Sequence, residues 1–507
     1  MAQTVNRTAR IAKNTLMLYV RMSVLLLVGL YTSRVVLEAL GENDYGIYSV
    51  VGGVVAMFTI ISGALNSAVT RFITFEMGKG GEAMLNKVYS TAVTIQLILA
   101  LIVVAIAEPV GIWFINNEMT IDPARIPAAR MVLHFTLLSF VFNLMSVPQM
   151  ASITAHEKMS AYAYIGVLDG LLRLVVALMI MRSSSDRLVY YAALMCGVVL
   201  IVRLTYGIYC RLNFEECRYR PVFDTALVKE MFSFAGWNFI GVTSGVLREH
   251  GGNILVNLFY GTAVNAARGV AVQLNGAVQG FVTNFMTAVN PQITKSYAAG
   301  EKEYMFSLVR RSSRMSFYLL FVLALPVLFN TEYILSIWLK EVPSHSVLFV
   351  QLFLIFAMSE ALSNPLITTM LATGKIRDYQ LVVGGLQLLN LPVSYVCLKL
   401  GAMPEITVVV AIVISQICFF VRLVMLRRMT GLQVGLFVRT VYLNVIKVAV
   451  IAAALSYLYI NLHDGSFVMF CLKAFLCFGT AVLSVLFIGC SNDERKEMLK
   501  FLKRRGA

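Results

Sequence analysis

Residues 14–48, NTLMLYVRMSVLLLVGLYTSRVVLEALGENDYGIY, decide the fold. Within them, Leu16 to Leu40 form an apolar run that contains only three charges, Arg21, Arg34 and Glu38. A run of this length can cross a bilayer, since a hydrocarbon core of about 30 Å needs about 20 helical residues. An arginine at membrane depth costs at least ~2.5 kcal/mol, so it is expected to face a polar cavity or a partner. We therefore predict that this helix lines a wet, cationic path for an anionic lipid headgroup.

The composition excludes an ordinary soluble protein. Of the 507 residues, 59% are hydrophobic and only 14% are charged, whereas globular domains carry about 25% charged residues. The net charge of +15 could indicate a nucleic-acid partner, but the basic residues lie between hydrophobic runs and form no soluble basic face. We expect no nucleic acid, and cytoplasmic loops that lie against anionic lipid. The class is an all-α polytopic membrane protein.

No motif for a cofactor or a reaction is present. The eight cysteines form no CxxC pair and the five histidines have no ligand spacing, so neither a disulfide framework nor a metal site is expected. The chain has no GxxxxGK[ST] loop for ATP, no HExxH and no GxSxG. We expect no catalytic residues, no cofactor and no enzyme activity. Work would come from a gradient or from consumption of a transported product.

Hydrophobic runs separated by polar breaks predict fourteen spans. They are 14–40, 45–74, 84–108, 127–153, 159–181, 187–211, 228–249, 253–289, 306–330, 345–372, 376–400, 403–427, 437–461 and 466–490. The eighth is rich in glycine and is expected to be bent or preceded by a re-entrant piece. Lys and Arg concentrate in every second loop and at both termini. The positive-inside rule therefore predicts that both termini are cytoplasmic; the family resemblance given below implies a bacterial inner membrane.

An internal repeat relates two halves of the chain. SVPQMASITAHEKMSAY, residues 146–162, corresponds to SNPLITTMLATGKIRDY, residues 363–379, at an offset of 217. The matched residues are Pro148 with Pro365, Ala155 with Ala372, Lys158 with Lys375, Tyr162 with Tyr379, and Pro109 with Pro326. Chance similarity between apolar helices is the alternative. Two copies of six helices insert in the same orientation, so we expect a pseudo-two-fold axis along the membrane normal and a site between the halves.

The repeat divides the chain into five parts. We predict a six-helix bundle over 1–212, a cytoplasmic linker over 213–227, a second bundle over 228–430, two additional transmembrane helices over 431–490 and a basic cytoplasmic tail over 491–507. The tail has the pattern of a basic amphipathic helix on the membrane surface. The alternative is a solvated tail. A chain that supplies both halves is sufficient as a monomer.

Charged residues within the spans are the candidates for function. Guanidinium groups grip phosphate oxygens in pairs, so an excess of arginine suits an anionic cargo. The candidate substrate-binding residues are Arg21, Arg34, Arg248, Arg268, Asn265, Gln273 and Asn275. Glu360 and His250 are candidates for ion coupling. Plainer roles stay open: Arg21 and Arg248 can snorkel to the interface, Glu38 can neutralise Arg34, and Asp169 can pair with Arg173 four residues on.

Several motifs resemble those of Wzx-type flippases for polysaccharide or O-antigen repeat units, members of the multidrug/oligosaccharidyl-lipid/polysaccharide exporter superfamily. They are RIAKNTLMLYVRM (10–22), YTSRVVLEALGENDYGIYSVVGGVV (31–55), SAVTRFITFEMGKG (67–80), AARGVAVQLNGAV (266–278), VNPQITKSYAAGE (289–301) and NPLITTMLATGKIRDYQ (364–380). The resemblance implies two bundles around a central cavity. It also implies that Arg21 and Arg34 serve a pyrophosphate, and that the two last helices form a groove for the lipid tail.

The resemblance implies a cargo and partners as well. The cargo would be an undecaprenyl-pyrophosphate-linked oligosaccharide, moved to the periplasmic leaflet by alternating access during lipopolysaccharide synthesis. Membrane lipids, a polysaccharide polymerase and a chain-length regulator are the further expected partners. Two other functions stay open. A cation-coupled multidrug antiporter would need a cluster of carboxylates in one half, and a membrane polymerase or ligase would need large outer loops.

Overall fold

The computed structural model describes residues 2–56, 58–119, 121–183, 186–221, 224–339, 342–459, 467–491 and 494–495. Every regular element in these ranges is helical, so the predicted all-α polytopic class is confirmed. Eleven helices of the described residues are long and apolar enough to cross a membrane. The other three predicted spans, 45–74, 228–249 and 253–289, fall on α1, α2 and α7, which are helical too. Most of the predicted amphipathic tail lies outside the described residues.

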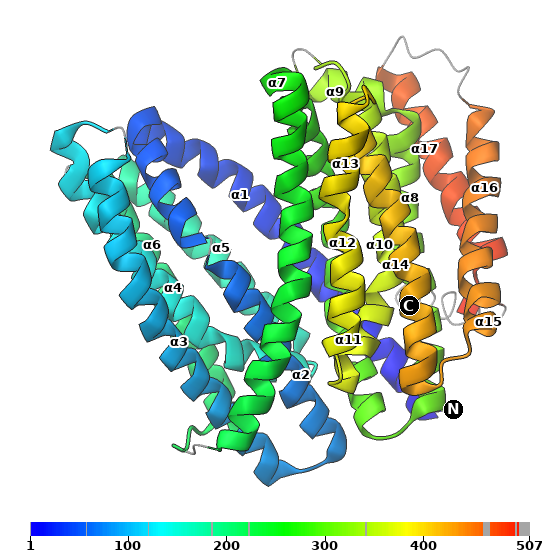
Figure 1. Cartoon of the computed structure of the whole chain (residues 1–507), viewed down its shortest axis with the longest axis horizontal. Coiled ribbons are helices and arrows are strands. Elements are labelled where there is room, and N and C mark those ends of the chain that lie inside the picture. Colours follow the sequence, from blue (N-terminus) through cyan, green and yellow to red (C-terminus); the bar gives the residue numbers. More distant parts are fainter. Residues whose placement is uncertain are drawn as a thin grey trace. The chain divides into compact units, whose positions relative to one another are not determined.

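The chain forms two compact units. Unit 1 is Met1–Val242 with Tyr297–Gly300, and unit 2 is Thr243–Ser296 with Glu301–Ala507. The division therefore falls within the helix α7, which passes from one unit into the other. Figure 1 labels the helices.

Unit 1 is built from α1 (Ala2–Ala56), α2 (Thr59–Lys79), α3 (Glu82–Asn117), α4 (Ile126–Ala155), α5 (Met159–Met181), α6 (Arg187–Asn213) and the start of α7 (Thr225–Ala298). One buried apolar cluster joins α1, α3, α4 and α6 around Val132 and Leu133. A second joins α1, α5 and α6 around Val36 and Ala177. Apolar surroundings favour helices, because a helix makes its backbone hydrogen bonds within its own segment.

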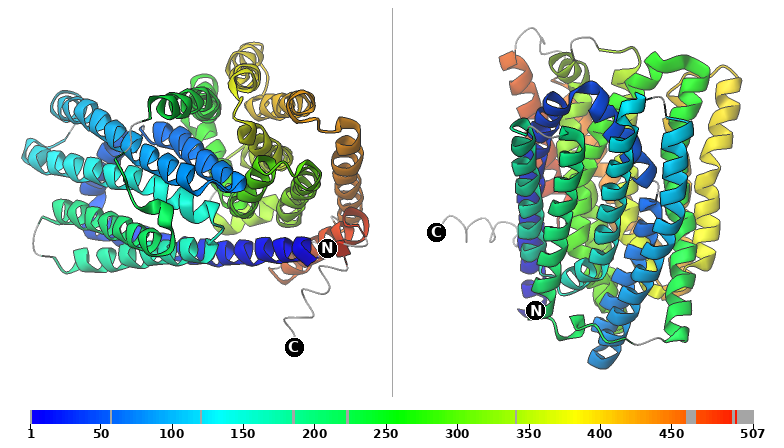
Figure 2. Two further views of the ribbon diagram at one scale, coloured as in Figure 1. Left: turned by 90° about the horizontal axis from the view of Figure 1, so that it is seen from below. Right: turned by 90° about the vertical axis from the view of Figure 1, so that its left-hand side faces the viewer.

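Unit 2 contains the rest of α7, α8 (Lys302–Phe329), α9 (Thr331–Trp338), α10 (Ser346–Thr373), α11 (Arg377–Tyr379), α12 (Gly385–Leu388), α13 (Asn390–Lys399), α14 (Ile406–Thr430), α15 (Val434–Phe437), α16 (Leu443–Tyr457) and α17 (Phe467–Ser484). The central helix is α10, because 67% of its apolar stretch is buried, against 50% or less in the other candidate spans. It packs between α8 and α14, and α16 and α17 pack on the other side of α8 (Figure 2).

The backbone repeats between the units. Gly41 (φ 76°) interrupts α1, and Gly261 (φ 78°), 220 residues later, interrupts α7. Gly80 (φ 80°) and Gly300 (φ 75°) end helices at the same offset. Positive φ is accessible mainly to glycine, so these matches are independent of apolar composition. They support the internal repeat. The bend expected in the eighth span is found at Gly261.

A similar side-chain contact joins the starts of two helices in each unit: α4 and α6 in unit 1, and α10 and α14 in unit 2. In unit 1, Arg125 caps α4 and donates to the α6 cap Asp186 at 2.7 Å, and it also contacts Asp44. In unit 2, His345 caps α10 and lies 2.6 Å from the α14 cap Glu405. The arginine–aspartate ion pair of unit 1 thus corresponds to a histidine–glutamate contact in unit 2.

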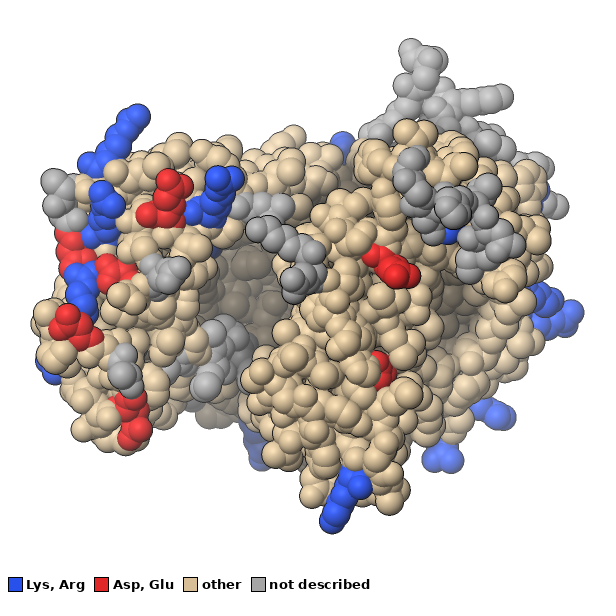
Figure 3. All heavy atoms as spheres, turned by 90° about the horizontal axis from the view of Figure 1, so that it is seen from above, with Lys and Arg blue, Asp and Glu red and all other residues tan. Residues whose placement is uncertain are grey.

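The surface is poor in charge, as a membrane-embedded chain requires. On the face shown in Figure 3, basic and acidic side chains are scattered among uncharged residues. Many exposed large apolar side chains lie on the candidate spans, including Leu27, Leu101, Ile208 and Phe475. Lipid tails would cover these side chains without burying any unpaired polar group.

Candidate functional site

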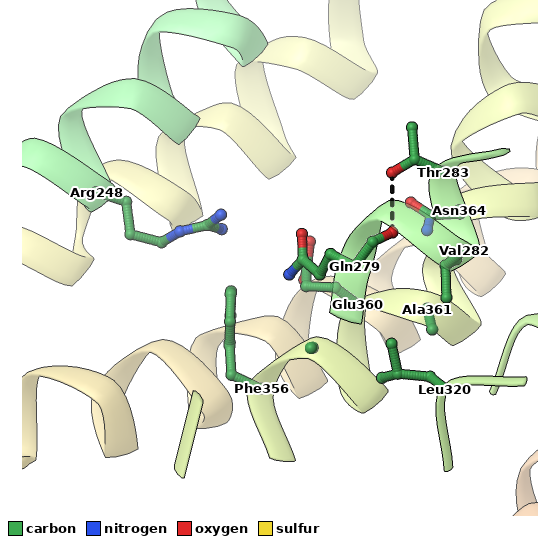
Figure 4. Close-up of a pocket in the computed structure, with 10 residues that line it drawn as sticks. Arg248, Gln279, Val282, Thr283, Leu320, Phe356, Glu360, Ala361 and Asn364 are labelled. Atoms are coloured by element: carbon green, nitrogen blue, oxygen red, sulfur yellow. Dashed lines mark hydrogen bonds between the residues drawn. The ribbon is translucent and has the colours of Figure 1, made fainter. Parts of the chain in front are cut away.

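A polar pocket lies within unit 2, between α7, α8 and α10. Its volume is about 140 Å³, which is room for several water molecules or one small polar group. Its lining contains two charged residues, Arg248 and Glu360, among polar and small apolar ones (Figure 4). The remaining lining residues are Gln279, Val282, Thr283, Leu320, Phe356, Ala357, Ala361 and Asn364.

Arg248 and Glu360 face each other across this pocket (Figure 4). Arg248 is half-buried on α7, and its guanidinium carbon lies 4.8 Å from the centroid of the Phe356 ring. This cation–π contact holds the guanidinium over α10. Glu360 lies one turn further along α10 and accepts a hydrogen bond from Ser415 of α14 at 2.6 Å. The pocket therefore presents one cation and one anion with open space between them.

Arg422 stands behind Glu360 and was not predicted from the sequence. It lies on α14, is 1% exposed, and donates to the Ser363 hydroxyl at 3.0 Å. It also shares a hydrogen bond with Tyr379 and acts electrostatically on Glu360. A lone arginine in the apolar run FFVRLVML, residues 419–426, was the available signal. Such a residue needs a partner at membrane depth; Arg422 is hydrogen-bonded to Ser363, and Glu360 acts on it electrostatically.

Arg268 braces the two segments of α7 on either side of Gly261. It is 4% exposed, contacts the Asn253 side chain, and donates to the Glu249 carbonyl at 3.2 Å. A Cβ on Gly252 would lie 2.6 Å from its guanidinium, so the glycine permits the close approach. These contacts enclose the Arg268 side chain and join the two segments of α7.

The polar residues of the second segment of α7 differ in exposure. Gln273 is exposed, whereas Asn265 and Asn275 are half-buried. The Oδ1 atoms of both asparagines are buried and accept no hydrogen bond within the part of the chain that the structure describes. Unsatisfied acceptors of this kind are uncommon and favour water or a polar ligand. His250 is exposed.

In unit 1, Arg21 and Arg34 have different surroundings. The Arg21 guanidinium lies 4.7 Å from the Tyr162 ring centroid, and its side chain fills the space beside Gly166 of α5. Arg34 is exposed, and among the described residues it forms neither an ion pair with Glu38 nor any hydrogen bond. The neutralisation of Arg34 by Glu38 is therefore not seen. The Asp169–Arg173 pair does form, at 3.0 Å.

The structure thus gathers only part of the predicted set. Arg248 and Glu360 line one pocket, Arg268 and Asn265 lie elsewhere along α7, and Arg21 belongs to unit 1. Within the described ranges no group of three His, Cys, Asp or Glu residues could hold a metal ion. The pocket lining carries one arginine, Arg248, and one carboxylate, Glu360, and a second arginine, Arg422, is buried behind the carboxylate.

A histidine–glutamate pair joins His156, the residue directly after α4, to Glu216 in the loop after α6. His156 Nε2 is 2.5 Å from Glu216 Oε1, and the His156 ring stacks on Phe214 with 4.0 Å between centroids. Burial raises the pKa of the Glu216 carboxyl. The hydrogen bond and charge of His156, together with the Glu216 backbone N–H, lower the pKa by a larger amount, so it lies below its ordinary value. The pair holds this loop against the end of α4.

Comparison with protein families gives one match. The model of the family described as "Polysaccharide biosynthesis protein" matches residues 11–297, which is more than half of the chain. A Bacillus subtilis protein named "Uncharacterized membrane protein EpsK" is 21% identical over 326 residues. That match spans 63% of this chain and 63% of the relative.

Solved structures show the same fold. A multidrug resistance MATE family transporter of the MOP superfamily, in an outward-facing conformation, matches with a TM-score of 0.70 over 83% of this chain and 96% of that one. A MOP superfamily transporter from Pyrococcus furiosus, described as having a binding pocket of reverse polarity, matches with a TM-score of 0.70 over 84% of this chain and 96% of that one. Both are 12% identical, so they speak for the fold alone. The predicted family resemblance is confirmed by the family match over residues 11–297.

Proposed function

This chain belongs to the polysaccharide biosynthesis protein family, and we propose that it is a flippase for undecaprenyl-pyrophosphate-linked oligosaccharide repeat units. It would move the headgroup from the cytoplasmic to the periplasmic leaflet of a bacterial inner membrane by alternating access, while the polyprenyl chain stays in lipid. Both termini would be cytoplasmic. That the chain is a membrane transporter of this superfamily follows from the family and the fold.

The observation that carries the proposal is the charge of the unit 2 pocket. Arg248 lines the pocket together with its single carboxylate, Glu360, and a second guanidinium, Arg422, is buried behind that carboxylate in the same helix bundle. A net positive charge at this depth is costly unless an anion uses it. A diphosphate has the negative charge and the paired oxygens that guanidinium groups bind.

The other candidate residues take roles that suit the same cargo. Arg34 is exposed and unpaired among the described residues, and so is available to a phosphate. Arg21 would contribute a second cation on α1. Gln273, Asn265 and Asn275 would bind sugar hydroxyls, and Arg268 would hold the shape of α7.

Ion coupling is assigned to the two remaining candidates. Glu360 and His250 are the groups through which a proton or ion gradient would act. Polysaccharide export that responds to neither the membrane potential nor the pH gradient would remove both residues from this role.

The experiment that tests the function is deletion of the gene followed by analysis of lipid-linked intermediates. The proposal expects complete undecaprenyl-linked repeat units to accumulate on the cytoplasmic leaflet, with no polymer at the surface. Restoration by the wild-type chain is the control. Accumulation of incomplete units, or of repeat units already on the periplasmic leaflet, contradicts the proposal.

A cation-coupled multidrug antiporter is the second candidate, favoured by the fold shared with MATE transporters. Its weakness is the pocket itself, since a cationic drug would meet Arg248, and Arg422 is buried behind the one carboxylate of the lining. Drug efflux measured in a pump-deficient strain discriminates between the two. Resistance conferred by this chain to several cationic drugs would support the antiporter.

A further inference from the structure

We propose that Glu360 is a built-in counter-ion of the pocket: the buried Arg422 holds its carboxylate in place, and an anionic ligand competes with it for Arg248. The inference rests on the proposed function for the identity of the ligand. It adds a positioning residue, Arg422, and a way for the empty pocket to tolerate its own charge.

The first support is the burial of Arg422. A guanidinium that is 1% exposed cannot be hydrated, and an uncompensated buried charge costs several kcal/mol. Its contacts are the Ser363 hydroxyl at 3.0 Å and the Tyr379 hydroxyl, both neutral. Glu360 is the carboxylate that acts electrostatically on it, although no ion pair within 4.0 Å joins them in the described structure. Arg422 has no access to the pocket lining, so its effect on a ligand passes through Glu360.

The second support is the chain of hydrogen bonds that fixes the carboxylate. Ser415 donates to Glu360 at 2.6 Å and lies 2.8 Å from Ser359. Ser359 accepts from Gln416 at 2.6 Å, and Gln416 accepts from Tyr442 at 3.0 Å. These hydrogen bonds are anchored on α10, on α14 and on Tyr442 in the π-helical segment before α16, so the carboxylate has little freedom. Glu360 therefore cannot swing out to follow Arg248 when that side chain takes a ligand.

The third support is the gap on the other side. Arg248 acts electrostatically on Glu360, yet no ion pair within 4.0 Å joins them in the described structure. The cavity of about 140 Å³ lies along this gap. The carboxylate therefore attracts Arg248 without occupying its N–H donors, and these donors stay available to an anion.

Proton binding follows from the same charges. The groups that face Glu360 are Arg248 from α7, Arg422 and Cys418 from α14, and Tyr379 from α11. Protonation of Glu360 removes the only negative charge among them. An anion should therefore bind more tightly when Glu360 is protonated, and by linkage the bound anion favours proton uptake. Affinity is expected to rise as the pH falls.

The test uses the full chain in detergent and UDP-glucose as the probe. This soluble diphosphate diester lacks the second ionisation of a phosphate monoester, so its own charge stays constant across the titration. Glu360→Gln keeps the shape of the side chain and removes the charge. We expect it to bind at least about tenfold more tightly than the wild type, since one unit charge a few ångströms away is worth that much at an effective dielectric near 20. Glu332→Gln, an exposed acid on α9, is the matched control and is expected to bind like the wild type.

Arg422→Lys tests the positioning role, because it keeps the charge and loses the planar fork. We expect weaker binding in the wild-type background and no effect in the Glu360→Gln background. Arg439→Lys, an exposed arginine, is its control. Equal weakening in both backgrounds would overturn the role of Arg422.

The main claim has its own contrary result. Glu360→Gln that binds no more tightly than the wild type, or no binding by either, overturns the counter-ion. Should Glu360→Gln fail to fold, Ser415→Ala decides in its place, because it removes the donor that fixes the carboxylate. We expect weaker binding of UDP-glucose, since the released carboxylate can turn toward Arg248, and unchanged binding overturns the claim. Failure of the proposed function would appear separately, as the absence of lipid-linked oligosaccharide transport in cells.

Discussion

Replacement of Gly261 by alanine is expected to destabilise unit 2 through the backbone alone. Gly261 has φ 78° and ψ −174° where α7 is interrupted, a region that residues with a side chain rarely adopt. A Cβ placed there would meet nothing within 4 Å, so the cost is conformational strain, about 1–3 kcal/mol.

The control lies in the same helix. Gly236 is exposed, has helical backbone angles, and also has open space around its Cβ position. Alanine at such a site stabilises a helix by about 0.5–1 kcal/mol relative to glycine. The same entropic gain applies at Gly261, so the two variants differ by the strain, about 1–3 kcal/mol. Gly41→Ala, with Gly29→Ala as control in α1, should give the same contrast if the repeat extends to the strain.

The assay is thermal unfolding of the purified variants in detergent, followed by tryptophan fluorescence. We expect Gly261→Ala to unfold below Gly236→Ala by several degrees, since roughly 2–4 °C corresponds to 1 kcal/mol in a chain of this kind. Equal transition temperatures for the two variants would refute the left-handed break at Gly261. A contrast at Gly261 without one at Gly41 would refute the equivalence of the two breaks.

The remaining predictions concern charged residues. Arg34→Ala should abolish surface polysaccharide while the protein stays folded and inserted, and normal output from this variant would remove Arg34 from the site. Glu216→Gln should lower the free energy of unfolding by about 1.5–3 kcal/mol, the contribution of a charged hydrogen bond. Because the folded pKa of Glu216 is lowered, this difference is present above its ordinary pKa and shrinks as the pH falls through the folded value; unfolding that differs equally at every pH would contradict it. Glu405→Gln should destabilise unit 2 by about 1–3 kcal/mol, since the carboxylate is 4% exposed and pairs with His345; an unchanged transition temperature would show that this contact contributes nothing.

The helical fold was predictable because a span is a local property. Each run of about 20 apolar residues determines its own helix, and no contact with distant residues is needed to recognise it. The repeat was visible for a similar reason: Pro148 and Pro365 occupy equivalent helices, α4 and α10.

The position of the break in α7 was not predictable. The sequence has three glycines in this stretch, Gly251, Gly252 and Gly261, and each could take a positive φ. Packing chose Gly261, because Gly252 is needed where Arg268 crosses the helix. The sequence contains no separate signal for these two uses of glycine.

The site was predictable in its charge and only partly in its members. Arg248 and Glu360 were found because each is a charge within an apolar run. Arg422 was missed although it has the same signal, since its partner Ser363 lies 59 residues away and Glu360 lies on another helix. Arg268 was predicted as a ligand-binding group, but its contacts with Glu249 and Asn253 depend on the fold of α7.

The central claim is that the arginines of this chain carry a diphosphate headgroup across the membrane. The most direct measurement is transport in liposomes that contain the purified chain and an undecaprenyl-pyrophosphate-linked oligosaccharide, with the fraction of headgroup on each leaflet followed by a glycosidase added outside. We predict transfer with the wild type and little or none with Arg34→Ala or Arg248→Gln, while Arg439→Gln behaves like the wild type. No transfer by the wild type, or equal transfer by the Arg34 and Arg248 variants, would contradict the account.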